Sequence, residues 1–593
     1  MRFKKPIIAV TTAVAMVSLA ACGGSGGNGN GDNGSDDNGN SGVDTSKLGS
    51  AGAGQDPTRK APATIEGAAE GGTVKVISYA GLNTMDPTEA YYTNTASILS
   101  GLVTRSLTQY SYDAKTGDMV LVPDIATDLG TPNEDFTEWK FTVRDGVKWE
   151  DGKDVTAEDI KYGIMRSFDR DTFPDGAAYS NDYFVDGDTY KGPYKSKDDY
   201  AGVTVDGKTL TIKMAKPFPD MPYWGAFPAM GPIPKGQDDP AKYRLHPMST
   251  GPYMFGDYTP EKKLTLVRNP NWDANTDPGR TAYPDEYQFD FQTPSTKVDQ
   301  ILLNDSGDAK NTLSYDDVLA ANFRTFQTKY KDRMALGGQP CTFYWAPDYR
   351  KVTDIDVRKA LAFAYPYKAA YLAAGAIEGV TRLPGTNLMP PGIPGRTEFN
   401  PLEGHELGAT DTAKAKELLE KAGETGFEVK FLFATDSPES VNVKDVIVRS
   451  LKEAGFTPKP VATTVADTST VRSDPKADIN IRSAGWCSDW PSGGSWFPPV
   501  IQSTNLDEEG LGANYAVFNE PAIDKKIGEI QEMDAKDQPA AWNDLDKEVM
   551  TEYFPLFVTA YGGVAQAHGS NIMGHNIDPT FGMPTWKDVW VKK

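Results

Sequence analysis

The stretch FTVRDGVKWEDGKDVTAEDIKY, residues 141–162, carries a strand, a turn and the start of a helix in succession. Apolar and polar residues alternate over Trp139–Val143, a pattern that predicts a strand. Residues 144–149 contain an Asp-Gly pair, which predicts a turn leading to a further strand. We expect a helix from Thr156, because its hydroxyl can cap the first turn and Asp159 takes the capping-box position.

Strands and helices alternate further along the chain as well. An alternating strand is expected at Gly71–Ser78, where the folded part should begin. In residues 411–461 a helix stopped by Gly423 is followed by a strand, a second helix stopped by Gly455 and another strand. This alternation indicates the α/β class.

Several motifs now occur in an order typical of one family. After residues 141–162 come STGPYMF at 249–255, LTLVRNPNW at 264–272 and DVRKALAFA at 356–364. Together they resemble the extracellular solute-binding proteins of family 5, the oligopeptide- and dipeptide-binding receptors of ABC importers. The similarity runs from Gly71 to the C-terminus. It implies a periplasmic-binding-protein-like α/β fold with two lobes, a hinge and an extra inserted domain.

The resemblance also implies a division of the chain into domains. The first lobe would be assembled from residues 71–115, 235–340 and 556–593. Residues 116–234 would form the inserted domain, and residues 341–555 the second lobe.

The first residues read as a targeting segment. Basic residues within the first five are followed by an apolar run at 7–17 and then by LAAC, which ends at Cys22. The small residues before Cys22 resemble a bacterial lipobox, in which the thiol is acylated and anchors the protein to the membrane. An ordinary secretory signal is the alternative. Residues 23–70 begin as an almost pure Gly, Ser, Asn and Asp sequence and predict a disordered tether.

The sequence SAGWCSDWPSGGSWF, residues 483–497, is the densest in aromatic and polar recognition groups. It follows a short strand-like run at 477–481, and α/β sheets bind ligands at the carboxyl ends of their strands. The tryptophans could equally belong to a core, since large aromatic side chains are mostly buried. Asp489 argues for a site, because a carboxylate among indole rings is costly without a cation or hydrogen-bond donor.

The resemblance gives two residues of this stretch a role. It implies that Asp489 pairs with the α-ammonium of a bound peptide and that Cys487 forms a disulfide with Cys341. Considered without the resemblance, two cysteines in an exported chain can form a disulfide or remain separate buried thiols. Many relatives carry a further acidic residue where this chain has Pro491 and Ser492, so the shape of the pocket should differ.

The remaining candidate residues would hold the peptide backbone and its side chains. Backbone pairing is expected at Gly485, Trp486 and Cys487, and at the loop after Ser78. The side chains expected at the site, including those of that loop, are Trp486, Trp490, Trp496, Tyr79, Asn83 and Tyr561.

Composition excludes several classes of function. The net charge of −22 and the absence of a basic stripe exclude a nucleic-acid partner. The four histidines show no ligand spacing with each other or with the cysteines, so no metal site is expected, and no cofactor is implied. We also find no motif for a catalytic nucleophile or metal, and therefore expect a binding protein and no enzyme.

The expected function is the capture of short peptides by hinge closure. The receptor would be a lipid-anchored monomer on the extracytoplasmic face of the bacterial cell membrane, passing its ligand to ABC permease subunits. Two alternatives remain open. One is an oligosaccharide receptor of the same family, because tryptophan-rich clefts suit sugar stacking, and the other is a peptide-sensing receptor without import.

Overall fold

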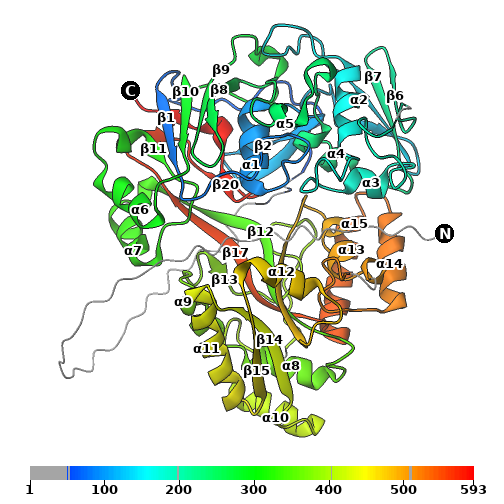
Figure 1. The fold of residues 1–593 in the computed structure, drawn as a ribbon, viewed down its shortest axis with the longest axis vertical. Coiled ribbons are helices and arrows are strands. Elements are labelled where there is room, and N and C mark those ends of the chain that lie inside the picture. The colour runs from blue at the N-terminus through cyan, green and yellow to red at the C-terminus, as the bar shows by residue number, and fades with distance from the viewer. Residues whose placement is uncertain (1–49, 51, 53, 197–198, 403, 507–509) are drawn as a thin grey trace.

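The computed structural model describes residues 50, 52, 54–196, 199–402, 404–506 and 510–593; the predicted signal peptide, Cys22 and most of the predicted tether lie outside them. Figure 1 shows an elongated molecule made of two parts, which we call the upper half and the lower half from their place in that view. Two long strands, β12 (Met334–Pro347) and β17 (Phe557–Ala567), run between them. They pair antiparallel and form the central connection of the two halves.

The upper half contains a five-stranded sheet assembled from distant parts of the chain, in the order β11-β1-β10-β9-β8. Its strands are β1 (Thr73–Ile77), β8 (Tyr253–Thr259), β9 (Lys263–Arg268), β10 (Glu286–Asp290) and β11 (Thr312–Leu313). β1 is parallel to both of its neighbours, β10 and β11. The pairs β10–β9 and β9–β8 are antiparallel. Val74 and Val76 are buried on one face of β1, which confirms the strand expected there.

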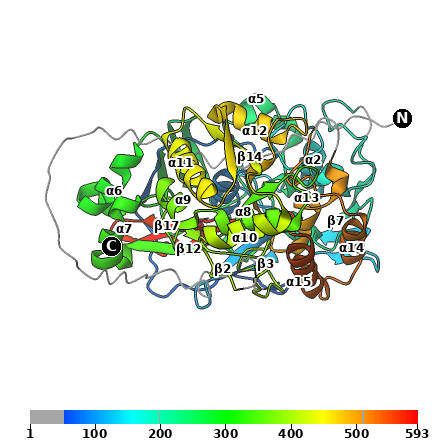
Figure 2. The ribbon, with the colours of Figure 1, turned by 90° about the horizontal axis from the view of Figure 1, so that it is seen from below.

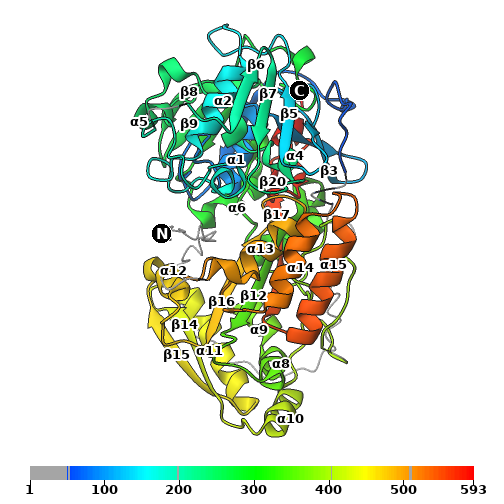
Figure 3. The ribbon, with the colours of Figure 1, turned by 90° about the vertical axis from the view of Figure 1, so that its right-hand side faces the viewer.

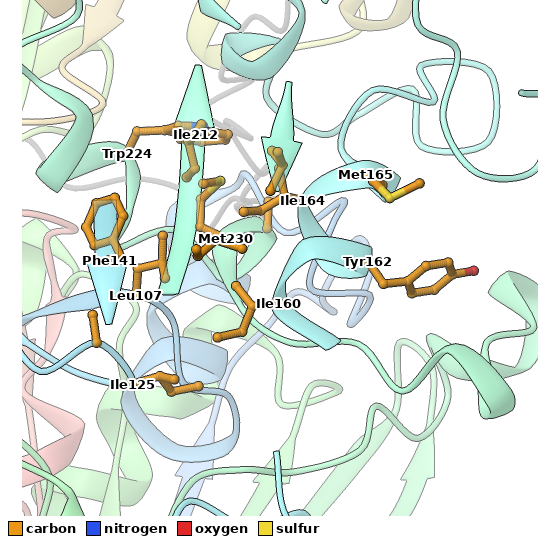
Figure 4. Packing of buried hydrophobic residues seen from close by; sticks show 14 of the residues in the cluster. Leu107, Ile125, Phe141, Ile160, Tyr162, Ile164, Met165, Ile212, Trp224 and Met230 are labelled. Atoms are coloured by element: carbon orange, nitrogen blue, oxygen red, sulfur yellow. The ribbon is translucent and has the colours of Figure 1, made fainter. Parts of the chain in front are cut away.

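A second sheet of the upper half has the order β4-β5-β7-β6. Its strands are β4 (Thr131–Pro132), β5 (Glu138–Thr142), β6 (Val203–Asp206) and β7 (Thr209–Lys213). Helix α2 (Ala157–Arg166) packs on this sheet through Ile160 and Ile164, both fully buried (Figure 4). The hydrophobic core around α2 also takes in residues from outside 116–234, namely Leu107, Tyr243, Met248 and Trp490.

The start of α2 follows the predicted capping box. The Thr156 hydroxyl accepts from the backbone N–H of Asp159, and the Asp159 carboxylate accepts from the backbone N–H of Thr156 at 2.9 Å. The prediction of a strand after the turn at 144–149 was wrong. Lys148 and Asp154 form only an isolated bridge, and the next element is α2. No strand of this segment, which is described throughout, pairs with β5, because both neighbours of β5 in the sheet are already β4 and β7.

The hairpin of β2 (Thr108–Asp113) and β3 (Asp118–Pro123) also belongs to the upper half. Near the C-terminus, β18 (Ile572–Met573) pairs with β21 (Trp590–Val591), and β19 (Ile577–Asp578) pairs with β20 (Met583–Pro584). The C-terminal residues thereby return to the upper half after β17.

The lower half is built on the sheet β13-β17-β12-β16, to which β13 (Arg382–Leu383) and β16 (Ile481–Cys487) contribute the edges. Beside it, β14 (Glu428–Ala434) and β15 (Thr457–Thr463) are parallel and are connected by α11 (Pro438–Glu453). Helix α10 (Thr412–Ala422) ends at Gly423, whose φ of 72° suits glycine at a left-handed cap. The predicted alternation in residues 411–461 is confirmed.

Helices cover both flanks of the lower half. Figures 2 and 3 show α14 (Pro521–Gln531) and α15 (Gln538–Glu548) on one flank, opposite α9 (Tyr367–Ala373) and α11.

The other α-helices of the described chain are distributed over both halves. They are α1 (Thr93–Ile98), α3 (Tyr179–Tyr183), α4 (Met221–Trp224), α5 (Pro240–Tyr243), α6 (Ser295–Asn304), α7 (Ala320–Lys329), α8 (Ile355–Ala364), α12 (Val465–Ser473) and α13 (Phe497–Val500).

Candidate ligand-binding site

The edge strand β16 leads into the loop at residues 488–497. The strand expected at 477–481 lies later in the chain, at Ile481–Cys487, so residues 483–487 of the aromatic stretch belong to the strand and not to the loop. The last residue of β16, Cys487, is disulfide-bonded to Cys341 on the neighbouring strand β12, with an S–S distance of 2.01 Å. The two cysteines are direct partners in the antiparallel register. The structure therefore contains the pairing that the resemblance implied, and the bond fastens the edge strand immediately before Asp489.

Asp489 extends from the lower half to two tyrosines of the upper half. One carboxylate oxygen accepts from the hydroxyl of Tyr91 at 2.6 Å, and the other accepts from the hydroxyl of Tyr179. Burial raises the pKa of Asp489 to about 6, although both hydroxyl bonds act to lower it. No cation forms an ion pair with this carboxylate within the described part of the chain.

Trp490 lies in the contact between the halves. Only 1% of it is exposed, and its indole N–H donates to Asp220 at 2.7 Å. Its ring packs edge-on against Tyr179, Phe218 and Phe227 of the upper half. The expectation that Trp490 lines a ligand pocket is not supported in this arrangement, because upper-half aromatic rings already cover the indole.

Trp496 and Tyr561 need the same correction. Both belong to the hydrophobic core of the lower half, with 0% and 1% of their surface exposed. The Tyr561 hydroxyl accepts from the backbone N–H of Asn387 at 2.9 Å and donates to the carbonyl of the same residue at 3.0 Å. These side chains stabilise the lower half because burial of large aromatic rings removes much apolar surface from water.

Gly485 and Trp486 stay close to the surface of the site. Both are half-buried, and the Trp486 indole N–H donates to the carbonyl of Ser495 at 2.8 Å, which orients the loop. Gly485 pairs with Phe343 on β12, whose ring would meet any side chain at residue 485. A glycine is therefore required here for the close approach of the Phe343 ring.

Tyr79 and Asn83 follow β1 in the upper half. The backbone N–H of Tyr79 donates to Asp316 at 3.0 Å, and burial, together with the charges of Asp316 and Asp317, raises the pKa of its phenol to about 12. Asn83 accepts from the Thr95 hydroxyl at 3.0 Å. The structure thus places Tyr79 beside two carboxylates, while Asn83 supports the start of α1.

Sequence analysis missed this pair of carboxylates and a nearby arginine. Asp317 is exposed, yet the surrounding protein raises the pKa of its carboxyl to about 6. Arg382 on β13 acts to lower the pKa of Asp317, and its guanidinium lies 4.4 Å from the centre of the Phe343 ring. No motif marked these residues, because they meet only through the fold.

Two halves joined by paired long strands, with polar side chains meeting between them, define a two-lobed binding protein. The family model of the bacterial extracellular solute-binding proteins, family 5 (middle region), matches residues 120–507. The chain belongs to this family.

Known proteins show the same relationship. The chain is 23% identical over 410 residues to the periplasmic oligopeptide-binding protein OppA of Salmonella typhimurium, covering 67% of this chain and 71% of OppA. It is 25% identical over 450 residues to the periplasmic murein peptide-binding protein MppA of Escherichia coli, covering 73% and 78%. The structure of clavulanic acid biosynthesis oligopeptide binding protein 2 superimposes with a TM-score of 0.81 at 22% identity, covering 92% of this chain and 99% of that one.

Membership of this family makes the chain an extracytoplasmic binding protein and no enzyme. In the described ranges, no helix has the length and apolar character needed to cross a membrane. Nor do the described residues bring three or more His, Cys, Asp or Glu side chains into an arrangement that could hold a metal ion.

Proposed function

We propose that this protein captures short peptides between its two halves and delivers them to an ABC permease. The observation that carries this proposal is the Asp489 carboxylate, which is held deep between the halves by two phenols and lacks a cation among the described residues. A peptide α-ammonium is a cation with N–H donors, and charge-assisted hydrogen bonds of this kind contribute roughly 1.5–3 kcal/mol.

The neighbouring strand supports backbone recognition. β16 is the edge of its sheet, so residues Gly485–Cys487 have one side without a strand neighbour among the described strands. An extended peptide can add to such an edge through backbone N–H and C=O groups, which makes recognition independent of its side chains. We assign the peptide backbone to this edge.

The opposite edge of the same sheet offers a partner for the other end of the peptide. The Arg382 guanidinium on β13 donates to the Thr381 carbonyl at 2.7 Å, and its other N–H groups can donate further bonds to a carboxylate. β13 lies three strand spacings from β16, about 14 Å across the sheet. A peptide that begins at Asp489 and ends at Arg382 would therefore pair with β16 only through its first residues and then cross the strand ends.

The domain organisation and the anchor belong to the same proposal. Residues 71–115, 235–340 and 556–593 would form one lobe, 116–234 the inserted domain and 341–555 the other lobe. Acylation at Cys22 would hold the protein at the membrane through the tether. Closure of the lobes would present the loaded form to the permease.

The carbohydrate alternative loses its main argument. Sugar stacking needs accessible aromatic faces, whereas Trp490 and Trp496 are 1% and 0% exposed, which leaves only the half-buried Trp486 of the three tryptophans in this stretch. The peptide proposal is therefore the one that we pursue.

Mass spectrometry of retained ligands tests the proposal. The mature chain, made without its signal peptide and Cys22, is purified from rich medium and denatured, and the released small molecules are identified. We expect a series of short peptides. Oligosaccharides or another class of solute would contradict the proposal. If no ligand is released, calorimetry with a pool of synthetic tetrapeptides replaces the first measurement, and absence of binding would contradict it equally.

A further inference from the structure

The chain preceding β1 forms a connection between the two halves. We call residues 50–56 the strap; the structure describes residues 50, 52 and 54–56 of it. On the upper half, the strap runs beside the free edge of β3. The Met119 N–H donates to the Ser50 carbonyl at 2.8 Å, the Leu121 N–H donates to the Gly54 carbonyl at 3.1 Å, and the Asp56 N–H donates to the Leu121 carbonyl at 2.9 Å.

These bonds make the strap an added strand. Gln55 and Leu121 are paired in a parallel bridge, and the backbone N–H of Ser50 also donates to the Asp118 carboxylate at 2.6 Å. An uncovered strand edge exposes unpaired N–H and C=O groups, so covering it satisfies these groups and prevents pairing with other chains. The upper half thus holds the strap by its backbone. The prediction of a disordered tether over residues 23–70 is therefore wrong for the described residues of the strap, which pair with β3.

The beginning of the strap contacts the lower half. The Ser50 hydroxyl donates to the Gly392 carbonyl at 2.7 Å, next to Ile393 in the core of the lower half. Gly52 lies so close to Pro491 that a Cβ at this position would be 2.5 Å from the Pro491 Cβ. Such a distance is shorter than van der Waals contact, so Gly52 has no room for a side chain while the halves are together.

Pro491 also links the strap to the ligand site. It follows Trp490, whose indole is hydrogen-bonded to Asp220 of the upper half, and stands two residues after Asp489. The strap therefore spans the same boundary that closes around the ligand site. Contacts with β3 lie within the upper half, whereas the contacts with Gly392 and Pro491 require the halves to be close.

We propose that the strap is a built-in device that stabilises the closed arrangement of the halves. Because it is already held on β3, its contacts with the lower half form at high effective concentration. This inference concerns the conformation without ligand and does not depend on which solute is bound.

Small-angle X-ray scattering of the ligand-free protein tests the proposal. The chain is secreted with Cys22→Ser to keep it unlipidated and is otherwise complete. Deletion of residues 50–54 should increase the radius of gyration, because the halves separate more often. Deletion of residues 30–34 removes the same length from the tether and should leave the radius unchanged.

A substitution separates loss of the strap contact from a change in chain length. Gly52→Leu should also increase the radius, while Ala61→Leu adds the same side chain at an exposed position and should not. If the radius of gyration increases with Gly52→Leu but not with the 50–54 deletion, the bulky side chain merely pushes the halves apart. That result would overturn the proposal. An unchanged radius in the 50–54 deletion would overturn it as well.

Ligand binding provides a second measurement. A protein that is less often closed binds its ligand more weakly in proportion to the lost closed fraction. We expect about three- to tenfold weaker binding of a tetrapeptide after deletion of residues 50–54, with wild-type affinity after deletion of residues 30–34. Equal affinities in the two deletions would contradict the proposal. The scattering result remains decisive even if the ligand is another solute.

Discussion

The carboxylate of Asp489 is held by the hydroxyls of Tyr91 and Tyr179 and has a pKa raised to about 6 by burial. A raised carboxyl pKa means that the free closed protein takes up a proton more readily than an ordinary aspartic acid. A peptide ammonium needs the ionised form. Peptide affinity should therefore be fully present only well above pH 6, near pH 7 and higher, and should decrease as the pH falls through 6.

We expect a peptide with a free amino terminus to bind about tenfold more weakly at pH 5.0 than at pH 7.5. Isothermal titration calorimetry of the wild-type protein measures this difference. Asp489→Asn should bind more weakly at pH 7.5 and lose the dependence on pH, because it cannot be ionised.

N-acetylated peptide is the matched control for this experiment. It lacks the ammonium, so Asp489→Asn should affect its binding much less than that of the free-amine peptide. Equal losses for both peptides would contradict the ammonium role of Asp489 and would indicate that the substitution only disturbs the contact with Tyr91 and Tyr179.

The four-stranded sheet of the lower half places its edges at opposite ends of the proposed ligand site. β16 ends at the disulfide before Asp489, and β13 begins at Arg382. If Arg382 binds the peptide carboxylate, Arg382→Met should weaken binding of a free-acid tetrapeptide about tenfold or more, since a charge-assisted bond is lost.

Peptide amides show whether the effect belongs to the carboxylate. A C-terminally amidated tetrapeptide should bind the wild-type protein and Arg382→Met with similar affinity in calorimetry. A similar loss for acid and amide would instead assign Arg382 to packing on the Phe343 ring, which its guanidinium contacts at 4.4 Å.

Local sequence signals predicted the elements well where the relevant interactions are short in range. The capping box at Thr156, the glycine stop at Gly423 and the alternation of β1 all involve residues within a few positions of each other. The strand expected after residues 144–149 was wrong, because sheet pairing depends on distant partners. Here the neighbours of β5 are β4 and β7, and the turn leads into α2.

Acidic groups distributed over the whole molecule give its stability a pH dependence. Burial raises the pKa of Asp316, Asp546 and Asp588 to about 7. Between pH 8.0 and 6.5 these groups take up protons in the folded chain but not in the unfolded chain, so the free energy of unfolding rises as the pH falls. Burial lowers the pKa of His568 and His575, which acts in the opposite direction and grows as the pH approaches and passes below about 6.5.

The melting temperature should therefore be about 1–2 °C higher at pH 6.5 than at pH 8.0, as measured by differential scanning calorimetry. Repetition at high salt screens the general repulsion of a chain with net charge −22 and leaves the effect of the buried groups. Asp546→Asn should reduce the difference, since it removes one of these groups. A lower melting temperature at pH 6.5 would contradict the prediction.

The order of motifs along the chain was enough to identify the family, the α/β class and the pairing of Cys341 with Cys487, because these features depend on residue types at characteristic positions. The same sequence could not show whether Trp490, Trp496 and Tyr561 face a ligand or a core. Their burial results from contacts with residues far away in the chain. Folding also brings together segments that lie far apart in the chain. Only for this reason does Asp489 accept hydrogen bonds from Tyr91 and Tyr179. The contacts of the strap with β3 and with Pro491 have the same origin.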